Sequence, residues 1–267
     1  MQRRPAVAGT FYAGTPEALR RQLDALLPRA RRPEPAVGLV APHAGYVYSG
    51  AVAAAVYGRI AVPERCVIFG PNHTGLGAAV AIMTEGEWVT PLGGVPLDRE
   101  LGQRILAHAP CMVEDPLGHQ REHAIEVQLP FLQALGRPFR FVPISLLAHD
   151  LATCREVAGA VADAVQEQGG GTLLVASTDM SHYVSRASAQ AKDGLAIDAM
   201  LGLDPERLHA VVRREGISMC GYHAVTTMLL AARRLGAHSA ELVRYGDSGE
   251  VAGDTEEVVA YAGLLVR

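Results

Sequence analysis

Short, almost wholly apolar segments alternate with helical patterns along this chain, and this alternation constrains the fold more than any other feature of the sequence. The apolar segments predict buried strands at residues 37–41, 66–69, 139–144 and 172–176. Strands that are apolar on both faces are typical of a parallel sheet covered by helices on each side. We therefore predict an α/β fold, a single three-layer α/β/α domain over residues 1–267 with a mostly parallel central sheet.

Local signals mark where several helices begin and end. Thr15-Pro16-Glu17 supplies an N-cap, a proline at the first helical position and an acid in the first turn, and Pro28 ends that helix. Gly169-Gly170-Gly171 closes another helix. The segment Ala78–Thr90 is less regular and is predicted as a hairpin at the sheet edge. Helices are predicted at 51–57, 151–168, 187–201, from 204 and at 225–235, with closing strands at 240–244 and 258–261.

Composition excludes several classes of protein. With 49% hydrophobic and 19% charged residues, the chain can bury enough surface to fold, so it is not disordered. No apolar run approaches the ~18 residues of a membrane-spanning helix, and the amino terminus lacks the apolar stretch of a secretory signal. Four cysteines without a CxxC spacing are expected to be free thiols. We therefore expect a cytoplasmic protein that has no membrane partner.

The charge balance gives no support to nucleic-acid binding. The 24 basic and 28 acidic residues leave a net charge of −4, whereas an obligate nucleic-acid binder usually carries a basic surplus. One basic cluster stands out, in which Arg20 and Arg21 are followed by Arg29, Arg31 and Arg32. This cluster is interpreted as the solvated face of a helix and the loop that follows it.

Three of the predicted strands are followed closely by a histidine. His43, His73 and His182 each lie within about six residues of the carboxyl end of a strand. Ligand sites of open parallel sheets lie outside those carboxyl ends, so three separate strands can place these imidazoles in one crevice. Imidazole is a suitable ligand for zinc, copper, iron and nickel. The alternative is that each histidine is a structural loop residue bonded to the backbone.

Cys220 is the fourth candidate ligand. It lies in the segment Ile217-Ser218-Met219-Cys220-Gly221-Tyr222-His223, just before the helix predicted at 225–235. A cysteine near a helix amino terminus can have a lowered pKa, and the thiolate is the form that binds metals. The alternative is a small buried hydrophobic residue. The other cysteines lie inside a strand, inside a helix or in an unassigned loop, and are weaker candidates: Cys66, Cys154 and Cys111.

A rival pattern is His119-Gln120-Arg121-Glu122-His123, which fits the H-x-x-E-H arrangement of inverted zinc peptidases. It would place both histidines on one helical face, with Glu122 as the base. Pro116 and Gly118 indicate instead that the helix begins near Arg121, which would leave His119 outside it. On that interpretation His123 lines the same crevice as the histidines that follow the strands.

Several segments together resemble the Memo family, whose prokaryotic members are labelled AmmeMemoRadiSam system protein B. The resemblance runs in order from Pro5 to Ala262, so it covers nearly the whole chain. The fold of this family is similar to that of class III extradiol ring-cleavage dioxygenases, which are non-haem iron enzymes. The segments that carry the resemblance are Ala41-Pro42-His43-Ala44-Gly45-Tyr46-Val47-Tyr48-Ser49-Gly50, Gly70-Pro71-Asn72-His73, Glu122-His123 with Gln128-Leu129-Pro130-Phe131, Ser177-Thr178-Asp179-Met180-Ser181-His182 and Cys220-Gly221.

The resemblance implies roles for individual residues. His43 and His73 match the two metal-binding histidines, and Cys220 matches the third ligand position. His182 matches the acid/base histidine of the dioxygenases, and Asp179 matches an aspartate that helps to form the metal site. A thiolate in place of the dioxygenase carboxylate shifts the preference toward copper(I), zinc or thiolate-tolerant iron. Ring cleavage therefore does not carry over, and His123 is assigned only to the pocket lining.

Three functions are consistent with these observations. The first is an iron- or copper-dependent redox protein with a His/His/Cys site, with zinc as a further possible metal. The second is a non-catalytic binding or scaffold protein that holds an anionic ligand or a phosphopeptide in the same crevice. The third is a zinc hydrolase built on His119, Glu122 and His123. The substrate would be a small molecule or peptide, and the family label implies AMMECR-like and radical S-adenosylmethionine partners.

Overall fold

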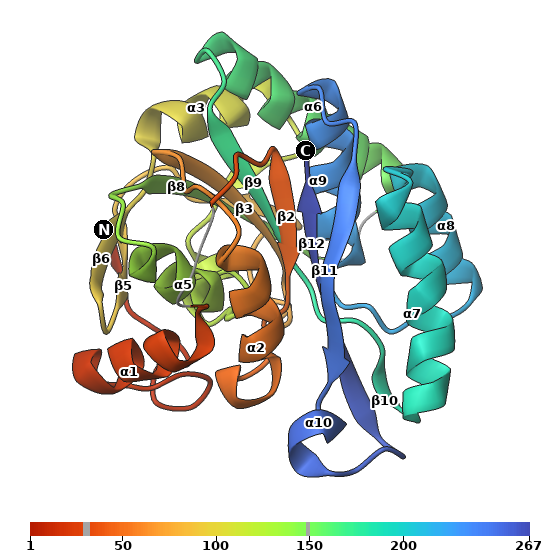
Figure 1. The fold of residues 1–267 in the computed structure, drawn as a ribbon. Helices are drawn as coiled ribbons and strands as arrows, with labels where there is room; N and C mark the ends of the chain where they lie inside the picture. The colour runs from red at the N-terminus through yellow and green to blue at the C-terminus, as the bar shows by residue number, and fades with distance from the viewer. Residues whose placement is uncertain (29–32, 148–149) are drawn as a thin grey trace.

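A computed structural model describes residues 1–28, 33–147 and 150–267. Its central feature is a large sheet in which strands follow the order β10-β12-β2-β9-β3-β8-β4-β7, with β11 paired to β12. Figure 1 shows this sheet between two groups of helices. The expected solvated loop at Arg29, Arg31 and Arg32 lies outside the described residues.

The middle of the sheet is parallel, as predicted. The four central strands are β2 (Gly38–Ala41), β9 (Thr172–Ser177), β3 (Arg65–Pro71) and β8 (Arg140–Leu146), and each runs parallel to its neighbour. The flanking strands are largely antiparallel, because β12 pairs antiparallel with β2 and β4 with β8. The α/β fold class is confirmed, with a mixed sheet around a parallel centre. The outer strands are β4 (Val80–Ile82), β7 (Val113–Glu114), β10 (His182–Val184), β11 (Ala240–Asp247) and β12 (Val258–Val266).

The hairpin predicted for Ala78–Thr90 is wrong. Strand β4 belongs to the central sheet, whereas β5 (Glu87–Thr90) lies in a separate small sheet with β1 (Gln2–Arg3) and β6 (Gly93–Pro96). Gly86, at a φ of +109°, adopts a backbone conformation open mainly to glycine and separates the two strands. Directly after Gly86, the amide of Glu87 donates a hydrogen bond to the backbone carbonyl of Met1. The amino-terminal strand β1 therefore pairs with β5 in the place where the predicted hairpin would have put β4.

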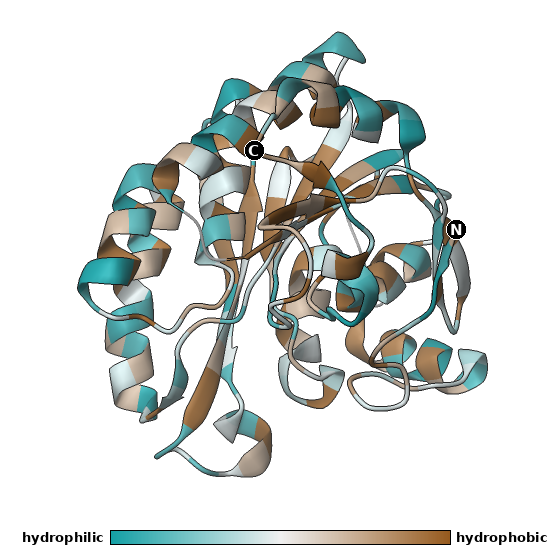
Figure 2. Ribbon diagram, turned by 180° about the vertical axis from the view of Figure 1, so that it is seen from behind, coloured by the Kyte–Doolittle hydropathy of each residue, from teal (hydrophilic) through white to brown (hydrophobic). Residues whose placement is uncertain are grey.

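Side chains alternate between two hydrophobic cores, one on each face of the sheet. Leu39 and Ala41 pack on the side of α1 and α2, whereas Val40 packs on the side of α6 and α9. This alternation follows from the two-residue period of a strand and gives the predicted three layers. Figure 2 shows hydrophobic strands between helices that carry hydrophilic residues.

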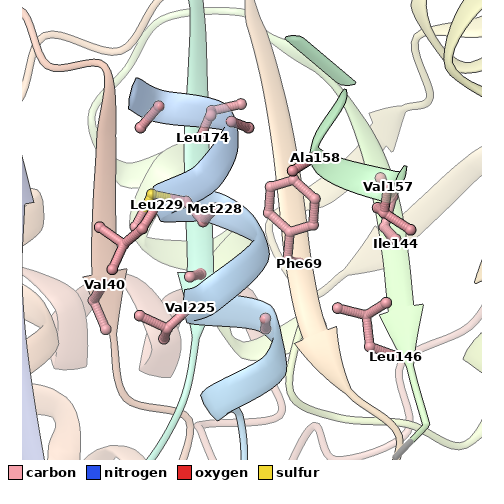
Figure 3. Packing of buried hydrophobic residues seen from close by; sticks show 14 of the residues in the cluster. Val40, Phe69, Ile144, Leu146, Val157, Ala158, Leu174, Val225, Met228 and Leu229 are labelled. Carbon is pink, nitrogen blue, oxygen red and sulfur yellow. The ribbon is translucent and has the colours of Figure 1, made fainter. Parts of the chain in front are cut away.

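Helix α9 packs closely across the parallel strands. Figure 3 shows Val225, Met228 and Leu229 directed toward the strand residues Val40 and Leu174. A Cβ atom placed on Gly38 would lie 2.7 Å from the sulfur of Met228. Glycine at this position therefore allows the helix to approach β2.

The predicted helices are present, and two of them begin earlier than expected. In α1 (Pro16–Leu26) the Thr15 side chain accepts a hydrogen bond from the Ala18 amide, as the capping signal indicated. Helix α2 (Tyr46–Tyr57) begins five residues before the predicted start and α9 (Tyr222–Arg234) three residues before. The other helices are α3 (Arg99–His108), α4 (Leu117–Gln120), η1 (Glu126–Gln128), α5 (Leu129–Ala134), α6 (Leu151–Glu167), α7 (Arg186–Leu201), α8 (Pro205–Arg214) and α10 (Gly249–Ala252).

The earlier start of α2 matters for the site described below. Only four residues then separate the end of β2 from the first turn of α2, so His43 is held in a short connection. Across the described part of the chain, no helix combines the length and apolar character that a membrane span requires. The cytoplasmic location stays a prediction.

Candidate metal centre

Three imidazoles from separate parts of the chain meet at the carboxyl end of the sheet. One ligand atom from each of His43, His73 and His123 lies within 4.8 Å of the others. The centroid of the His43 ring lies 5.1 Å from that of His73 and 5.4 Å from that of His123. The rings of His73 and His123 are stacked, with their centroids 4.8 Å apart. This spacing places the donor atoms of all three side chains around one small volume.

Hydrogen bonds on His43 fix which ring nitrogen is free. Its Nδ1 lies 2.9 Å from the hydroxyl of Ser177, the last residue of β9. The Ser177 hydroxyl donates its own proton to the carbonyl of Ala124 at 2.6 Å, so it must accept a proton from His43 Nδ1. The Nε2 of His43 is therefore left with a lone pair that can bind a metal.

His73 is oriented in the same way by Glu122. The Glu122 carboxylate lies 2.9 Å from His73 Nδ1 and also accepts the backbone amides of His73, His123 and Ala124. Because a carboxylate only accepts, His73 Nδ1 carries the proton and its Nε2 is free. A carboxylate behind a histidine is a frequent arrangement at metal sites, where it holds the ring and makes it a stronger donor.

The site electrostatics keep two of the imidazoles neutral. Burial, reinforced by the neighbouring His73, lowers the pKa of His43 to about 3, and burial lowers the pKa of His123 to about 4 with a further contribution from His43. Burial alone would also lower the pKa of His73, but the hydrogen bond and charge of Glu122 raise it overall. Burial raises the pKa of Glu122, but His73 and the backbone amides more than offset this and lower it to about 2. Neutral imidazoles beside an ionised carboxylate are the protonation states that metal binding requires.

Cys220 lies against this cluster, beside the ring nitrogen of His43 that is free to bind a metal. Its Sγ is 3.2 Å from His43 Nε2 and accepts the Asp179 amide at 3.3 Å. The group of mutually close donor atoms found in the described residues contains the three imidazoles and not this sulfur. The expected lowering of the Cys220 pKa is wrong, because burial and the charge of Asp179 raise it above the usual thiol range. Cys220 is thus a neutral thiol in the metal-free site.

Asp179 and His182 follow β9, as predicted, and take different places. The buried Asp179 carboxylate accepts the backbone amides of His43 and Ala44, and its other oxygen lies 3.9 Å from His43 Nε2. Burial raises the pKa of Asp179, although these amide hydrogen bonds lower it in part. His182 Nδ1 lies 2.7 Å from the Met180 carbonyl, which can only accept, so the Nε2 of His182 is free. Asp179 therefore positions the His43 loop, whereas His182 is oriented by the Met180 carbonyl.

These side chains line one cavity of about 540 Å³. The three histidines that follow strands, His43, His73 and His182, all face it, together with His123 and Asp179. The expectation that parallel strands bring these histidines into one crevice is confirmed. Their individual roles as ligands or as proton acceptors stay predictions.

The helix required by the H-x-x-E-H pattern is not present. The short helix α4 contains His119 and ends before Glu122 and His123, opposite to the expected start near Arg121. The His119 ring is fully buried and lies edge-on to Trp88 at 5.6 Å. Among described residues, His119 is not part of the group of donors that could hold an ion. The three residues therefore do not form the helical zinc site that the pattern suggests.

Sequence reasoning missed the two most informative features of this site. The sequence predicts His123 only as part of the pocket lining, although it is the third imidazole. It gives Glu122 the role of a base only in the rival zinc-hydrolase pattern, and it does not predict the pairing of Glu122 with His73. Both residues follow a short helix instead of a strand. The expectation that ligands bind at the carboxyl ends of parallel strands therefore does not identify them. The adjacent pair Glu122-His123 was the available signal.

We expect Glu122→Gln to weaken metal binding by about 10- to 100-fold, the range typical of a lost outer carboxylate. The substitution keeps the shape of the side chain but removes the charge that holds the proton on His73 Nδ1. Titration of the purified variant with a metal ion in competition with a chelator measures the change. Glu64→Gln, at an exposed position, is the control. Unchanged affinity in Glu122→Gln would show that Glu122 does not support a metal ligand.

The fold and the site define an α/β protein with a candidate transition-metal centre at the carboxyl ends of its parallel strands. The chain belongs to the Memo-like family, whose model matches residues 3–265. A MEMO1 family protein of Methanopyrus kandleri is 44% identical over 281 residues, covering 100% of this chain and 99% of the relative. A MEMO1 family protein of Thermotoga maritima is 41% identical, covering 100% of both chains.

A solved structure gives a more distant comparison. An uncharacterized protein of Escherichia coli K12 superposes with a TM-score of 0.47 and 14% sequence identity, covering 76% of this chain and 87% of that one. A likeness at this level supports no functional argument. The family membership therefore rests on sequence, and the chemistry must be argued from the site.

Proposed function

We propose that this protein binds one iron or copper ion through His43 and His73, flanked by His123 and Cys220, and uses it for redox chemistry on a small molecule in the adjoining cavity. The observation that carries this proposal is the set of three imidazole donor atoms within 4.8 Å of one another. Nitrogen and sulfur donors suit copper, iron and zinc and are poor ligands for magnesium or calcium. When bound, the ion would supply electron transfer and Lewis acidity.

The residues around the cluster would orient the ligands and transfer protons. Ser177 and Glu122 keep the protons of His43 and His73 on Nδ1, so both Nε2 atoms stay available as donors. Asp179 holds the His43 loop through two backbone amides. His182, with a free Nε2, would accept or return the proton that accompanies a redox step on the bound molecule.

Hydrolysis is less well supported than redox chemistry. A hydrolytic metal site usually places a free carboxylate near the bound water as a general base. Here Glu122 accepts three backbone amides and His73, and Asp179 accepts two backbone amides. Glu122 is therefore committed to holding the structure, and so is one oxygen of Asp179, whereas the other oxygen of Asp179 lies 3.9 Å from His43 Nε2. Zinc would fit the donor atoms, but it does not change oxidation state and so could not support the proposed redox chemistry.

Binding of an anionic ligand or phosphopeptide is also less well supported. The cavity lining, as far as the structure describes it, contains neither lysine nor arginine. His43 and His123 have lowered pKa values and are neutral near pH 7, so they would not supply the missing positive charge. AMMECR-like and radical S-adenosylmethionine partners stay proposals taken from the family resemblance.

Metal analysis of untagged protein purified without oxygen tests the proposed function. We expect about one equivalent of iron or copper per chain, retained through dialysis, and a change of metal oxidation state on addition of a reductant or oxidant. Protein that retains no ion after incubation with Fe(II), Cu(I) or Zn(II) would refute metal binding. Retention of zinc alone would refute the redox assignment.

The role of Cys220 can be separated from that of the imidazoles. Thiolate is a soft ligand that favours Cu(I), so Cys220→Ser is expected to weaken Cu(I) binding by about tenfold or more, with a smaller effect on Fe(II). Competition with chelators specific for each ion measures both affinities. Cys111→Ser removes a free thiol at a position outside the cavity lining and serves as the control. Equal affinities before and after Cys220→Ser would exclude the sulfur as a ligand.

A further inference from the structure

The cavity that adjoins the imidazole cluster is also lined by aromatic side chains. Tyr48 comes from the first turn of α2, Tyr183 from β10 and Tyr261 from β12. Phe11 joins them at the inner end, where its ring lies 4.8 Å from that of His123. Aromatic residues make up only 5% of this chain. Four of them on one cavity is a strong concentration of rings.

Tyr183 occupies a backbone conformation that is unfavourable for its residue type. Its φ is +55°, and its side chain is 75% exposed at the cavity mouth. A non-glycine residue in the left-handed region is uncommon, and such positions cluster at sites that bind ligands. The preceding residue is held in place, since the His182 amide donates to Ser218 and its ring to Met180. The fold therefore keeps a large ring at the mouth of the cavity.

Tyr261 contributes a polar atom that the described residues leave without a partner. Its side chain is only 2% exposed, yet no hydrogen bond to its hydroxyl occurs within residues 1–28, 33–147 and 150–267. Because this residue lines the cavity, its hydroxyl is available to a bound molecule. The phenol thus adds a hydrogen-bonding group to an otherwise aromatic wall.

One exposed carboxylate lines this cavity. It belongs to Glu257, which immediately precedes β12, whereas Asp179 is buried and its pKa is raised by that burial. Glu257 is exposed and forms no ion pair with any cation in the described parts of the chain. No lysine or arginine is found among the described lining residues. A ligand that carries a positive charge would therefore be favoured over a neutral or anionic one. Figure 1 shows α10 and β10 near each other at the lower end of the sheet, and both elements supply lining residues to this cavity.

We infer that the outer cavity binds an organic cation, with an alkylammonium group held against Tyr48, Tyr183 and Tyr261 and beside Glu257. Aromatic rings attract ammonium groups through the negative charge of their faces, and a nearby carboxylate adds to that attraction. This inference rests on the proposed function, because it names the class of small molecule that the metal centre would act on. The imidazoles line the same cavity.

Choline and its uncharged analogue 3,3-dimethylbutan-1-ol provide a matched pair of probes. The two molecules have nearly the same shape, and only choline carries a positive charge. We expect choline to bind the wild-type chain at least about fivefold more tightly, measured by titration calorimetry or by amide shifts in NMR. Glu257→Gln should remove most of that difference, because the carboxylate contributes about fivefold at this exposed position. Glu256→Gln, at the adjacent exposed residue outside the cavity lining, should leave it unchanged.

A second variant tests the aromatic wall. Tyr183→Leu keeps an apolar side chain at an exposed position and should weaken choline binding by about threefold while leaving the uncharged analogue unaffected. Equal affinity of the two probes for the wild-type chain, or an unchanged preference in both Glu257→Gln and Tyr183→Leu, would overturn the inference. Metal content is measured on the same samples, with and without prior chelation. Choline preference in metal-free protein would support the cation site even if the redox proposal fails. Metal binding without choline preference would refute the cation site alone.

Discussion

His43→Ala is expected to lower metal affinity by more than about 100-fold, the upper end of the effect of losing an outer partner. His43 is the side chain at the centre of the site, since its ring contacts those of His73 and His123 and its Nε2 lies 3.2 Å from the Cys220 sulfur. Removing it takes away one of the three imidazole donors, the one that also contacts the Cys220 sulfur. Metal retained after dialysis, measured by mass spectrometry, gives the result directly.

Two controls keep this prediction open to refutation. His182→Ala removes an imidazole from the same cavity that lies outside the group of close donors, so metal retention should persist. His108→Ala removes a histidine at the far end of α3, and neither binding nor folding should change. Circular dichroism and thermal unfolding confirm that each variant is folded. A folded His43→Ala protein that keeps its full metal content would refute the site as drawn.

Much of this site could be predicted from sequence, because strands and their carboxyl ends are local features. The apolar runs before His43, His73 and His182 identified the strands, and the geometry of a parallel sheet brought the three residues together. The contact between Cys220 and His43 was also expected, through the family resemblance. The first inference depends on short stretches of chain whose structure follows from their own residues, and the second depends on the resemblance.

The position of Glu122 and His123 could not be predicted in this way. They follow a helix of four residues and precede a 3₁₀ turn. Neither element is long enough to show the repeating apolar pattern from which secondary structure is predicted. The conformation of this segment is set by contacts with the amino terminus, more than a hundred residues away in sequence. The same reason explains the error at Ala78–Thr90, where β5 pairs with β1 and β6 instead of β4.

A buried network of hydrogen bonds around Glu126 joins the amino-terminal segment to the loop that carries Glu122 and His123. This carboxylate is fully buried and forms an ion pair with Arg3. It also accepts hydrogen bonds from the Tyr12 hydroxyl and from the backbone amides of Ala6 and Val7. Glu126 therefore fixes a segment of irregular chain that has little other means of holding its shape.

Arg3 completes the link to the residues of the site. Its guanidinium donates to the carbonyls of His119, at 3.1 Å, and Glu122, at 2.5 Å, and lies 4.3 Å from the centre of the Trp88 ring. Glu122 is the residue that orients His73, so one buried cation supports both the fold of the loop and a candidate metal ligand. Loss of this ion pair should affect stability and metal affinity together.

Glu126→Gln is expected to destabilise the protein by about 3–5 kcal/mol, because it leaves the Arg3 cation buried without a counter-charge. For a chain of this size, that loss corresponds to a decrease of roughly 6–20 °C in the midpoint of thermal unfolding. The amide group of glutamine would also place a donor against the donors of Tyr12 and the backbone. Calorimetry and chemical denaturation measure the change, and metal affinity should fall in the same variant.

The comparison with an exposed ion pair makes the stability prediction specific. Arg104 pairs with Glu100 and Glu167 at the surface, and Arg104→Met should cost no more than about 1 kcal/mol. Replacing both buried partners, in Arg3→Met with Glu126→Leu, should recover part of the stability lost in Glu126→Gln, since no buried charge is then left unpaired. The double variant should still bind metal weakly, because Arg3 no longer holds the Glu122 carbonyl. Normal metal affinity in the double variant would show that the ion pair stabilises the fold without positioning the loop of Glu122 and His123. That result would refute the positioning role of Arg3.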